Sequence, residues 1–541
     1  MVSSAQEPSV SAEPAGITRR GFVGMAAAAV VSWPLLGACT SSATPAARRS
    51  TGTPKKGGVL NVGYTGGGSS ETLDPNKLFN AIDFARTAQI YDIAYTLDPQ
   101  GRTIPWLVQE ATPGPTAWKM RVRDGVTFHD GRPLTADDVA WSYNWILKAS
   151  NGAYGRGFLL SGRVASVRAL DKTTVVVELN QPNFLLDQTL ARQYLAIFQN
   201  GTHPGAGGKF IGTGPFKLDR FARGQRAVFS ANPNYWGGSG DLVSQGPYLD
   251  GLQIVSAASP DALPGAVRSG QVDVVASIAF EQLAAFQGSS EFTVYNSLSS
   301  NCNVHAMDTQ AAPYSDPRVR KALRLLVDRE QQLSNGVDGQ GKIANDLFAW
   351  FDPYYAADLP QISYDPDQAK SLLKAAGMES ATFELFTTNG VPGIVASANL
   401  LAASAKRAGV NVKVTQVPYD SYFSTAYLKK PFFGSNWGGT LISQTWNSAL
   451  TTTASYPETH WQNAQWSSLY NQALASSDDA RRKSLMLDAQ RILHDEGGYI
   501  IPVFTNNSDI ARSNIAGLKS SPLGPLGGGD RPDFRGTWIE D

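Results

Sequence analysis

Few residues of this chain stand at spacings that perform chemistry. Ser371 and Lys374 match the Ser-x-x-Lys pattern of penicillin-interacting enzymes, but the Lys-Thr-Gly partner of that pattern is absent. His129 and Asp130 precede Gly131, a setting typical of turn residues at a hairpin end. We interpret Cys302 as a packed thiol. The sequence therefore predicts no catalytic residue and no enzyme.

Metal and cofactor patterns are absent as well. The five histidines lie far apart in the sequence, and none forms a His-x-x-x-His pair or stands beside a cysteine at ligand spacing. Three glycines, Gly66 to Gly68, follow a predicted strand at Val59–Val62. Their spacing matches neither the dinucleotide fingerprint nor the P-loop, so we interpret them as a loop that exposes its backbone. No metal site and no cofactor are predicted.

One segment combines the features of a binding surface. The stretch from Pro431 to Pro457 contains no charged residue, and it mixes glycine, Ser, Thr, Asn and Gln with Trp437, Trp446 and Tyr456. Small-molecule pockets need accessible backbone groups, small polar side chains and aromatic walls together. The segment offers all three, and the alternative is an ordinary core strand with polar loops.

Regular elements are easy to place in two regions. Trp118 to Val122 alternate apolar and charged residues, and Val126 and Phe128 continue the pattern after a turn, which predicts a hairpin. A second hairpin is expected to end in the strand 174–179. Thr135 and Asp138 resemble a capping box at the start of a helix. Further on, Asp316-Pro317 and Asp365-Pro366 each predict a helix start, and 479–496 predicts a long amphipathic helix. Strands and helices alternate in the second half, which indicates an α/β organisation.

The N-terminal stretch Thr18–Cys39 predicts export. It begins with Arg19 and Arg20, continues with an apolar run shorter than the ~20 residues of a membrane span, and ends in Leu-Gly-Ala-Cys. The start resembles a twin-arginine signal, and the end resembles the lipobox of bacterial lipoproteins, which implies a lipid on Cys39. The alternative is a buried helix that ends in an ordinary cysteine, and the choice between twin-arginine and general export stays open.

Composition limits the partners and the compartment. A chain of 541 residues indicates two or three domains. The formal net charge is zero, so no basic surplus favours nucleic acid. With Cys39 lipidated, Cys302 has no partner for an intramolecular disulfide.

Several motifs follow one another along the chain. The first motif is Arg121 to Asp138, with Val-Arg-Asp-Gly-Val-Thr-Phe-His-Asp-Gly and Leu-Thr-Ala-Asp-Asp-Val. The others lie at 212–216, 232–238, 247–251, 270–273, 315–323 and 364–377. Together, and in this order, they resemble the family 5 extracellular solute-binding proteins, which are the dipeptide- and oligopeptide-binding components of bacterial ABC importers. The resemblance covers nearly all of the chain from Gly57 to about Phe504.

The resemblance implies a fold and a division of the chain. We expect an α/β, two-lobed periplasmic-binding-protein fold of type II (cluster C), with an additional inserted α+β domain. The expected parts are the export signal (1–38), a flexible tether (39–56), a discontinuous lobe I (57–90, 211–300 and 501–541), an inserted domain II (91–210) and a lobe III (301–500).

The resemblance also implies a function. The chain would capture dipeptides to oligopeptides in a cleft between the lobes and deliver them to the permease and ATPase subunits of an importer. It would be a monomer, held by the lipid on Cys39 at the outer face of the cytoplasmic membrane. The residues expected to contact ligand are Ser69, Ser70, Asn301, Asn303, Asn436, Trp437, Gly438, Gly439, Thr440 and Trp446.

One departure from the family stands out. In peptide-binding relatives an aspartate shortly after the tryptophan holds the α-ammonium of the ligand. Here Thr440 to Gln444 occupy that place, and the next acid is Glu458. A buried ammonium without a carboxylate costs several kcal/mol. An oligosaccharide, haem or a metal chelate therefore stays open as ligand, and so do a cell-envelope hydrolase and a ligand-sensing lipoprotein as other classes of function.

Overall fold

The described part of the computed structural model comprises residues 53–98, 100–237, 246–518, 522–523, 532 and 534–540. All of them belong to one unit of the chain, Ala47–Asp541. The predicted export signal and Cys39 lie outside the described residues, so the structure does not test them.

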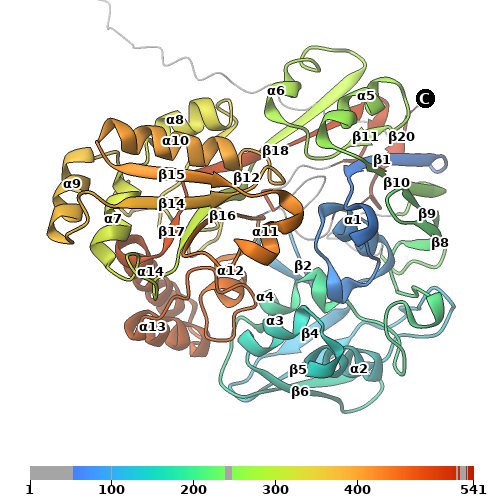
Figure 1. Cartoon of the computed structure of the whole chain (residues 1–541). Helices are drawn as coiled ribbons and strands as arrows, with labels where there is room; N and C mark the ends of the chain where they lie inside the picture. Colours follow the sequence, from blue (N-terminus) through green and yellow to red (C-terminus); the bar gives the residue numbers. More distant parts are fainter. Residues whose placement is uncertain are drawn as a thin grey trace, which may run out of the picture. The chain divides into compact units, whose positions relative to one another are not determined.

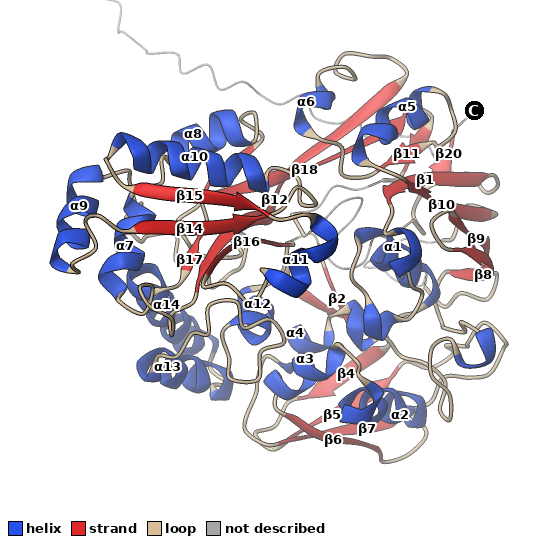
Figure 2. Cartoon of the chain, in the orientation of Figure 1, coloured by secondary structure: helices blue, strands red, loops and turns tan. Residues whose placement is uncertain are grey.

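A twelve-stranded mixed sheet forms the framework of this unit (Figures 1 and 2). The strand order is β15 (Asn411–Gln416), β14 (Thr382–Thr387), β16 (Phe432–Trp437), β12 (Phe292–Met307), β18 (Val503–Arg512), β11 (Val274–Val275), β1 (Val59–Thr65), β10 (Gly251–Ala257), β9 (Arg226–Ala231) and β8 (Phe216–Ala222). Two short strands lie off this path: β13 (Gly341–Ile343) pairs with β18, and β17 (Tyr499–Ile500) pairs with β12.

Two long strands join the two ends of the sheet. The first half of β12 pairs with β18, and its second half pairs with β16. The register between β12 and β18 shifts between Leu298 and Asn301, where β12 passes from one half to the other. We call β1 and β8–β11, with their helices, the β1 lobe, and we call β14–β17, with their helices, the β16 lobe.

Helices cover both halves. The β1 lobe carries α1 (Ala81–Ile90), α5 (Leu263–Arg268) and α6 (Phe280–Leu283). The β16 lobe carries α7 (Pro317–Leu325), α8 (Arg329–Gly336), α9 (Pro366–Ala375), α10 (Ile394–Arg407), α11 (Tyr419–Thr425), α12 (Ile442–Ala449), α13 (Ala464–Ala475) and α14 (Asp479–Glu496). In Figure 1, α8 and α10 lie together along β15, at the edge of the sheet, and α13 and α14 lie together at another side of this lobe.

A separate antiparallel sheet forms what we call the inserted module. Its strand order is β4 (Val108–Thr112), β5 (Ala117–Val122), β7 (Thr174–Leu179) and β6 (Val164–Ala169). The helices α2 (Ala136–Leu147), α3 (Gly155–Ser161) and α4 (Leu186–Leu190) accompany this sheet. Two-stranded ladders join β2 (Tyr95–Leu97) to β3 (Thr103–Pro105) and β19 (Ile515–Ala516) to β20 (Trp538–Ile539).

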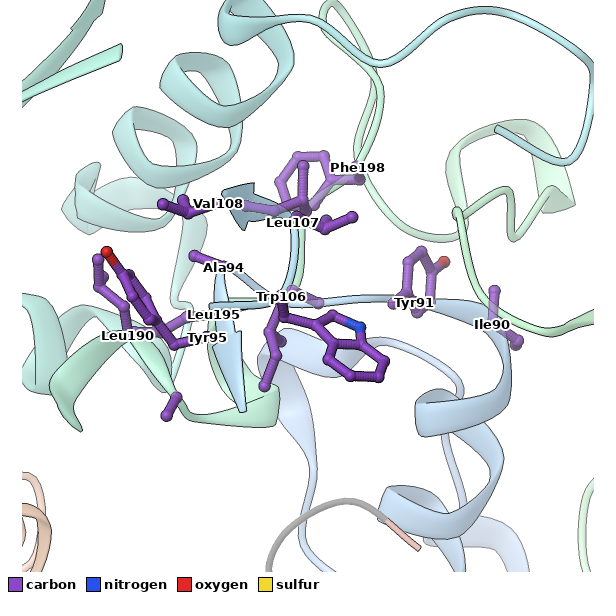
Figure 3. Packing of buried hydrophobic residues seen from close by; sticks show 14 of the residues in the cluster. Ile90, Tyr91, Ala94, Tyr95, Trp106, Leu107, Val108, Leu190, Leu195 and Phe198 are labelled. Atoms are coloured by element: carbon purple, nitrogen blue, oxygen red, sulfur yellow. The ribbon is translucent and has the colours of Figure 1, made fainter. Parts of the chain in front are cut away.

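The β1 lobe and the inserted module share one hydrophobic core. Buried residues of β1 and β10 belong to the same cluster as those of β5, β7 and α2. Figure 3 shows the junction, where residues from the end of α1, from β2 and from the start of β4 meet residues that follow α4. The β16 lobe is filled by two other clusters, one of them around Trp446 and the other around Phe432.

The local sequence signals were confirmed, and so was the second predicted hairpin, in which β6 pairs with β7 in antiparallel fashion. Thr135 and Asp138 form the predicted capping box, and Asp316 and Asp365 cap α7 and α9. The hairpin predicted from Trp118 to Phe128 is wrong, because the partners of β5 are β4 and β7. Val126 and Phe128 are both buried, but alternating burial does not select the strand that pairs.

Candidate functional site

Five of the predicted ligand-contacting residues lie together at the end of the β12–β16 ladder. Asn303 pairs with Asn436, and Cys302 pairs with Trp437. A Cβ atom at Gly438 would lie 4.0 Å from Oδ1 of Asn301. Asn436 and Gly438 are exposed. The ladder therefore presents amides and an accessible backbone on one strand end.

At this end, the second edge of β16 has no strand partner among the described residues. Between β14 and β16 the parallel pairing consists of Phe386 with Phe433. Beyond Phe433, the strand continues to Trp437 with β12 on one side and, within the described residues, no strand on the other. An unpaired edge offers main-chain N–H and C=O groups to an extended ligand.

Gly439 is fixed by close packing. A Cβ atom there would lie 2.6 Å from the carbonyl oxygen of Pro522 and 2.7 Å from that of Leu523. The same Pro522 oxygen accepts a hydrogen bond from the Ser300 N–H at 3.0 Å. The short segment 522–523 thus lies against both β12 and the residue that follows the ladder, and only glycine fits beneath it.

Two predicted site residues belong to the interior instead. Trp446 is 1% exposed, and its ring meets those of Trp466 and Tyr470 at centroid distances of 5.2 and 5.1 Å. It packs in the core, so the prediction that it contacts ligand is corrected. Thr440 is buried too, and its hydroxyl lies 2.6 Å from that of Thr445.

Burial accounts for the lack of charge in only one part of the stretch 431–457. All eight residues of α12 are buried. Part of this helix faces the inserted module, where the Gln444 amide donates to the Gln188 carbonyl at 2.7 Å and the Ser161 hydroxyl donates to the Asn447 carbonyl at 3.0 Å. Burial explains the lack of charge in the helix, whereas Asn436 and Gly438 are uncharged although exposed.

A buried carboxyl group holds Trp437. Glu458, which is 1% exposed, accepts a hydrogen bond from the indole N–H of Trp437 at 2.9 Å. It also accepts bonds from the hydroxyls of Ser435 at 2.6 Å and Tyr499 at 2.9 Å. Burial raises the pKa of Glu458, and the hydrogen bonds from Ser435, Trp437, Tyr499 and Tyr427 offset this only in part. Glu458 is thus a positioning residue for the Trp437 ring.

Ser69 and Ser70 lie in a different loop, in the short 3-10 helix Gly68–Ser70 of the β1 lobe, and both are exposed. The Ser70 hydroxyl donates to the Gly67 carbonyl at 2.7 Å. Within the described residues, no hydrogen bond joins either serine to the β12–β16 ladder. The two groups of predicted residues thus belong to different lobes.

A second buried glutamate organises the serine loop. Glu71 forms an ion pair with Arg86 at 2.6 Å, and both side chains are inaccessible to solvent. Glu71 also accepts from the N–H of Gly67 at 3.2 Å, from the N–H of Gly224 at 2.9 Å and from the Ser256 hydroxyl at 2.7 Å. Burial alone would raise the pKa of Glu71, but the hydrogen bonds and the Arg86 charge outweigh it and lower the pKa.

The two lobes meet through aromatic rings that sequence reasoning missed. Phe79, just before α1, makes an edge-on contact with Phe423 of α11 at 5.2 Å. These side chains are 53% and 38% exposed. Phe423 in turn contacts Tyr419 at 5.7 Å. Their sequence neighbourhood shows no motif, so only the fold brings them together.

The uncharged loop 387–393 contacts both the β12–β16 ladder and the aromatic residues between the lobes. The Asn303 amide donates to the Pro392 carbonyl at 2.9 Å. Gly390 lies under the Tyr419 ring, where a Cβ atom would be 1.9 Å from the ring edge. Tyr419, Asn389, Gln416 and Pro418 line an open depression of about 400 Å³. The run Thr387 to Gly393, which is rich in glycine and polar residues, was the available signal for this loop.

Polar side chains supply hydrogen-bond partners where the register between β12 and β18 shifts. The Ser299 hydroxyl donates to the Thr505 carbonyl at 2.8 Å, and the Asn301 amide donates to Asn507 at 2.6 Å. The Trp350 indole donates to the Ser299 carbonyl at 2.7 Å. Buried backbone groups need such partners wherever a ladder is interrupted.

The residues that the sequence analysis considered for catalysis do not form a site in the structure. Ser371 and Lys374 are exposed on α9, and His129 and Asp130 lie in a turn. Among the described residues, no group of three or more His, Cys, Asp or Glu side chains is placed to hold a metal ion. None of the helices in the described residues has the length and apolar character needed to cross a membrane.

Comparisons with known proteins agree on one family. Residues 102–460 match the family described as "Bacterial extracellular solute-binding proteins, family 5 Middle". The Di/tripeptide-binding protein 2 of Pseudomonas aeruginosa is 24% identical over 492 residues, which are 84% of this chain and 91% of that protein. The nickel-binding periplasmic protein of Escherichia coli is 24% identical over 481 residues, 83% of this chain and 89% of that protein.

A solved structure shares the fold. The periplasmic binding protein DppA of Helicobacter pylori, in complex with the peptide STSA, superposes with a TM-score of 0.77 at 20% identity, over 90% of this chain and 99% of that one. The predicted two-lobed type II fold with an additional inserted α+β domain is thereby confirmed.

Proposed function

Because the chain belongs to family 5 of the bacterial extracellular solute-binding proteins, we propose that this substrate-binding protein of an ABC importer captures peptides between its two lobes. It would deliver them to the permease of that importer, which the ATPase subunits drive. The domain division predicted from the sequence is part of the proposal, with the β1 lobe as lobe I, the inserted module as domain II and the β16 lobe as lobe III.

The unpaired edge of β16 is the observation that carries the proposal. From Ser435 to Trp437 this edge adjoins no strand of the described chain, while Asn436 and Gly438 are exposed. An extended peptide pairs with such an edge as an added strand, and its main-chain groups are the same for every sequence. The positioned Trp437 would form a wall for one side chain. Binding would thus tolerate many peptide sequences.

Closure of the lobes would complete the capture. A ligand shifts an open–closed equilibrium only as far as it binds the closed state better, and a change from 1:99 to 99:1 takes about 5.5 kcal/mol. The register shift of β12 between Leu298 and Asn301 is the place where we expect the sheet to bend. The Phe79–Phe423 contact already joins the two lobes in this structure, and we expect it to be lost when the lobes open.

Titration calorimetry of the purified protein with peptides of two to five residues tests the proposal. We expect saturable heat with at least one length, and loss of that heat in Trp437→Ala. Trp141→Ala is the matched control, since Trp141 is 37% exposed and lies on α2 of the inserted module. Silence with every peptide, together with heat from an oligosaccharide panel, would contradict the peptide ligand and favour a glycan instead.

We also propose lipidation of Cys39 and anchoring at the outer face of the cytoplasmic membrane. The support is the order of paired arginines, short apolar run and Leu-Gly-Ala-Cys in the sequence. Metabolic labelling with palmitate should mark the wild-type protein and leave Cys39→Ala unlabelled. Equal labelling of both would contradict the proposal.

A further inference from the structure

The surface around the free edge of β16 is formed by uncharged residues from five segments of the chain, all of them exposed or half-buried. On the ladder these are Asn303, Asn436 and Gly438, and on the adjoining loop they are Asn389 to Gly393. The aromatic contact between the lobes adds Phe79, Tyr419 and Phe423. None of these side chains carries a charge. Exposure does not explain this, since exposed positions of proteins are those that charged residues favour.

Two described carboxylates next to this surface, Glu458 and Asp352, are already engaged by the protein. Glu458 lies beneath Trp437, is buried, and accepts hydrogen bonds from Ser435, Trp437 and Tyr499. Asp352 is buried as well, and it accepts from the N–H of Ile442 at 2.9 Å at the start of α12. Neither group faces a ligand laid along the free edge.

Two charged residues flank the aromatic contact in sequence. Lys77 precedes Phe79 by two positions and is exposed. Asp420 follows Tyr419, and its side chain is outside the part of the structure that is described. These two residues are the direct rivals of an uncharged site, so both enter the test below.

We propose that the free edge of β16 binds an uncharged segment of its ligand, and that free amino and carboxyl termini are not required for binding. The preferred ligands would be peptides presented through an internal segment, or peptides whose ends are acylated, amidated or cyclised. The inference rests on the proposed peptide function. It deepens that proposal by naming the substrate class.

Desolvation is the physical reason. A charged terminus that loses water in a closed site needs an opposite charge or several strong hydrogen bonds in return. A neutral amide or hydroxyl needs only ordinary hydrogen bonds, which the asparagines and the strand edge supply. A surface of this composition therefore favours a neutral ligand segment over a charged one.

The decisive experiment compares one pentapeptide of neutral side chains in four forms: free, N-acetylated, C-amidated and blocked at both ends. Calorimetry of the full protein should give dissociation constants within about threefold of each other, because no charge-assisted bond is lost. Raising the salt from about 0.02 to about 0.5 M should change them by less than about twofold, because screening acts on charge pairs.

Each other outcome is informative. A loss of about tenfold or more on blocking an end would overturn the inference and leave the peptide function intact. If that loss disappears in Asp420→Asn for the amino end, or in Lys77→Gln for the carboxyl end, the anchoring residue is identified. Binding of glycans with silence from all four peptides would contradict the peptide function, while the uncharged character of the site would stand.

A designed charge provides the positive control. Asn436→Asp is nearly isosteric and places a carboxylate on the exposed strand end. We expect it to make a blocked pentapeptide with one internal lysine bind about fivefold or more tightly than the same peptide with neutral side chains, with a clear salt dependence. Asn436→Ser is the matched neutral variant and should show no preference. An Asn436→Asp variant without preference would show that the ligand lies elsewhere, and would overturn the inference.

Discussion

Glu71 in the β1 lobe and Glu458 in the β16 lobe are the same residue type in nearly the same degree of burial, yet they work in different ways. Each is 1% exposed and holds a segment of the candidate site in place. Glu71 has Arg86 as an ionic partner at 2.6 Å, whereas Glu458 has two hydroxyls and an indole N–H among its donors.

The difference teaches that compensation decides the charge state of a buried carboxyl group. A cation and several donors together lower the pKa of Glu71 despite its burial. Neutral donors alone leave the pKa of Glu458 raised. The β1 lobe thus orders its serine loop with a closed ion pair, and the β16 lobe orders Trp437 without bringing a positive charge near the ligand surface.

The largest effect is expected from breaking the ion pair. Glu71→Gln leaves Arg86 buried without its anion, and breaking a buried pair by removing one partner typically costs about 3–5 kcal/mol. Urea unfolding should show this loss in the free energy of unfolding. Glu110→Gln, at an exposed position of β4, is the matched control and should stay within about 0.5 kcal/mol. Equal losses in both would contradict the comparison.

The same substitution in the other lobe should cost less. Glu458→Gln strands no buried cation, so we expect a loss of about 1–2 kcal/mol, the scale of one or two hydrogen bonds. Peptide affinity should fall as well, because the Trp437 ring is released. In a Trp437→Phe background the added Glu458→Gln change should leave affinity unaltered. A further loss there would mean that Glu458 does not act through Trp437.

Opposite pH dependences would sharpen the comparison. The pKa of Glu71 is lowered on folding, so its stabilising charge is present above the ordinary value of 4.5 and is lost as pH falls through the folded pKa. The pKa of Glu458 is raised, so its contribution is largest below 4.5 and declines as pH rises through the folded pKa.

Melting scans at pH values on both sides of 4.5 should therefore give two stability differences from wild type that change with pH in opposite directions. The gap between wild type and Glu71→Gln shrinks towards low pH, and the gap to Glu458→Gln shrinks towards high pH, each by at most about 1.4 kcal/mol per pH unit. Parallel gaps would refute the assignment of the two charge states.

The smallest effect concerns the contact between the lobes. Phe79→Ala and Phe423→Ala should each weaken ligand binding, and a double-mutant cycle should give a coupling of about 0.5–1.5 kcal/mol, as for other aromatic pairs. The cycle is measured on ligand affinity, since the contact is expected only in the closed state. A coupling of zero would show that the rings meet without contributing to closure.

The sequence predicted what local patterns control. The caps at Asp316 and Asp365 and the bounds of α14 were confirmed, because capping groups and helical periodicity act within a few residues. The grouping of Asn303, Asn436 and Trp437 needed the family resemblance, since residues so far apart in sequence meet only through the β12–β16 register.

Other features were beyond sequence reasoning for a physical reason. Trp446 stands in an uncharged segment that suits a pocket, but a buried helix between two parts of a protein has the same composition. Glu458 was visible as the next acid after Trp437, yet its bond to the indole depends on the fold. The pairing of Glu71 with Arg86 joins residues on different elements and leaves no local pattern.

The passage of β12 and β18 through both halves of the sheet has a consequence for the history of this fold. Two lobes joined by linkers can be exchanged as modules, but here the strands that join them are also core strands of each lobe. A recombination point between the two lobes would interrupt the hydrogen-bonded pairing of β12 or β18. Substitutions in the loops at the strand ends leave both ladders intact, so we expect changes of specificity there rather than by exchange of a lobe.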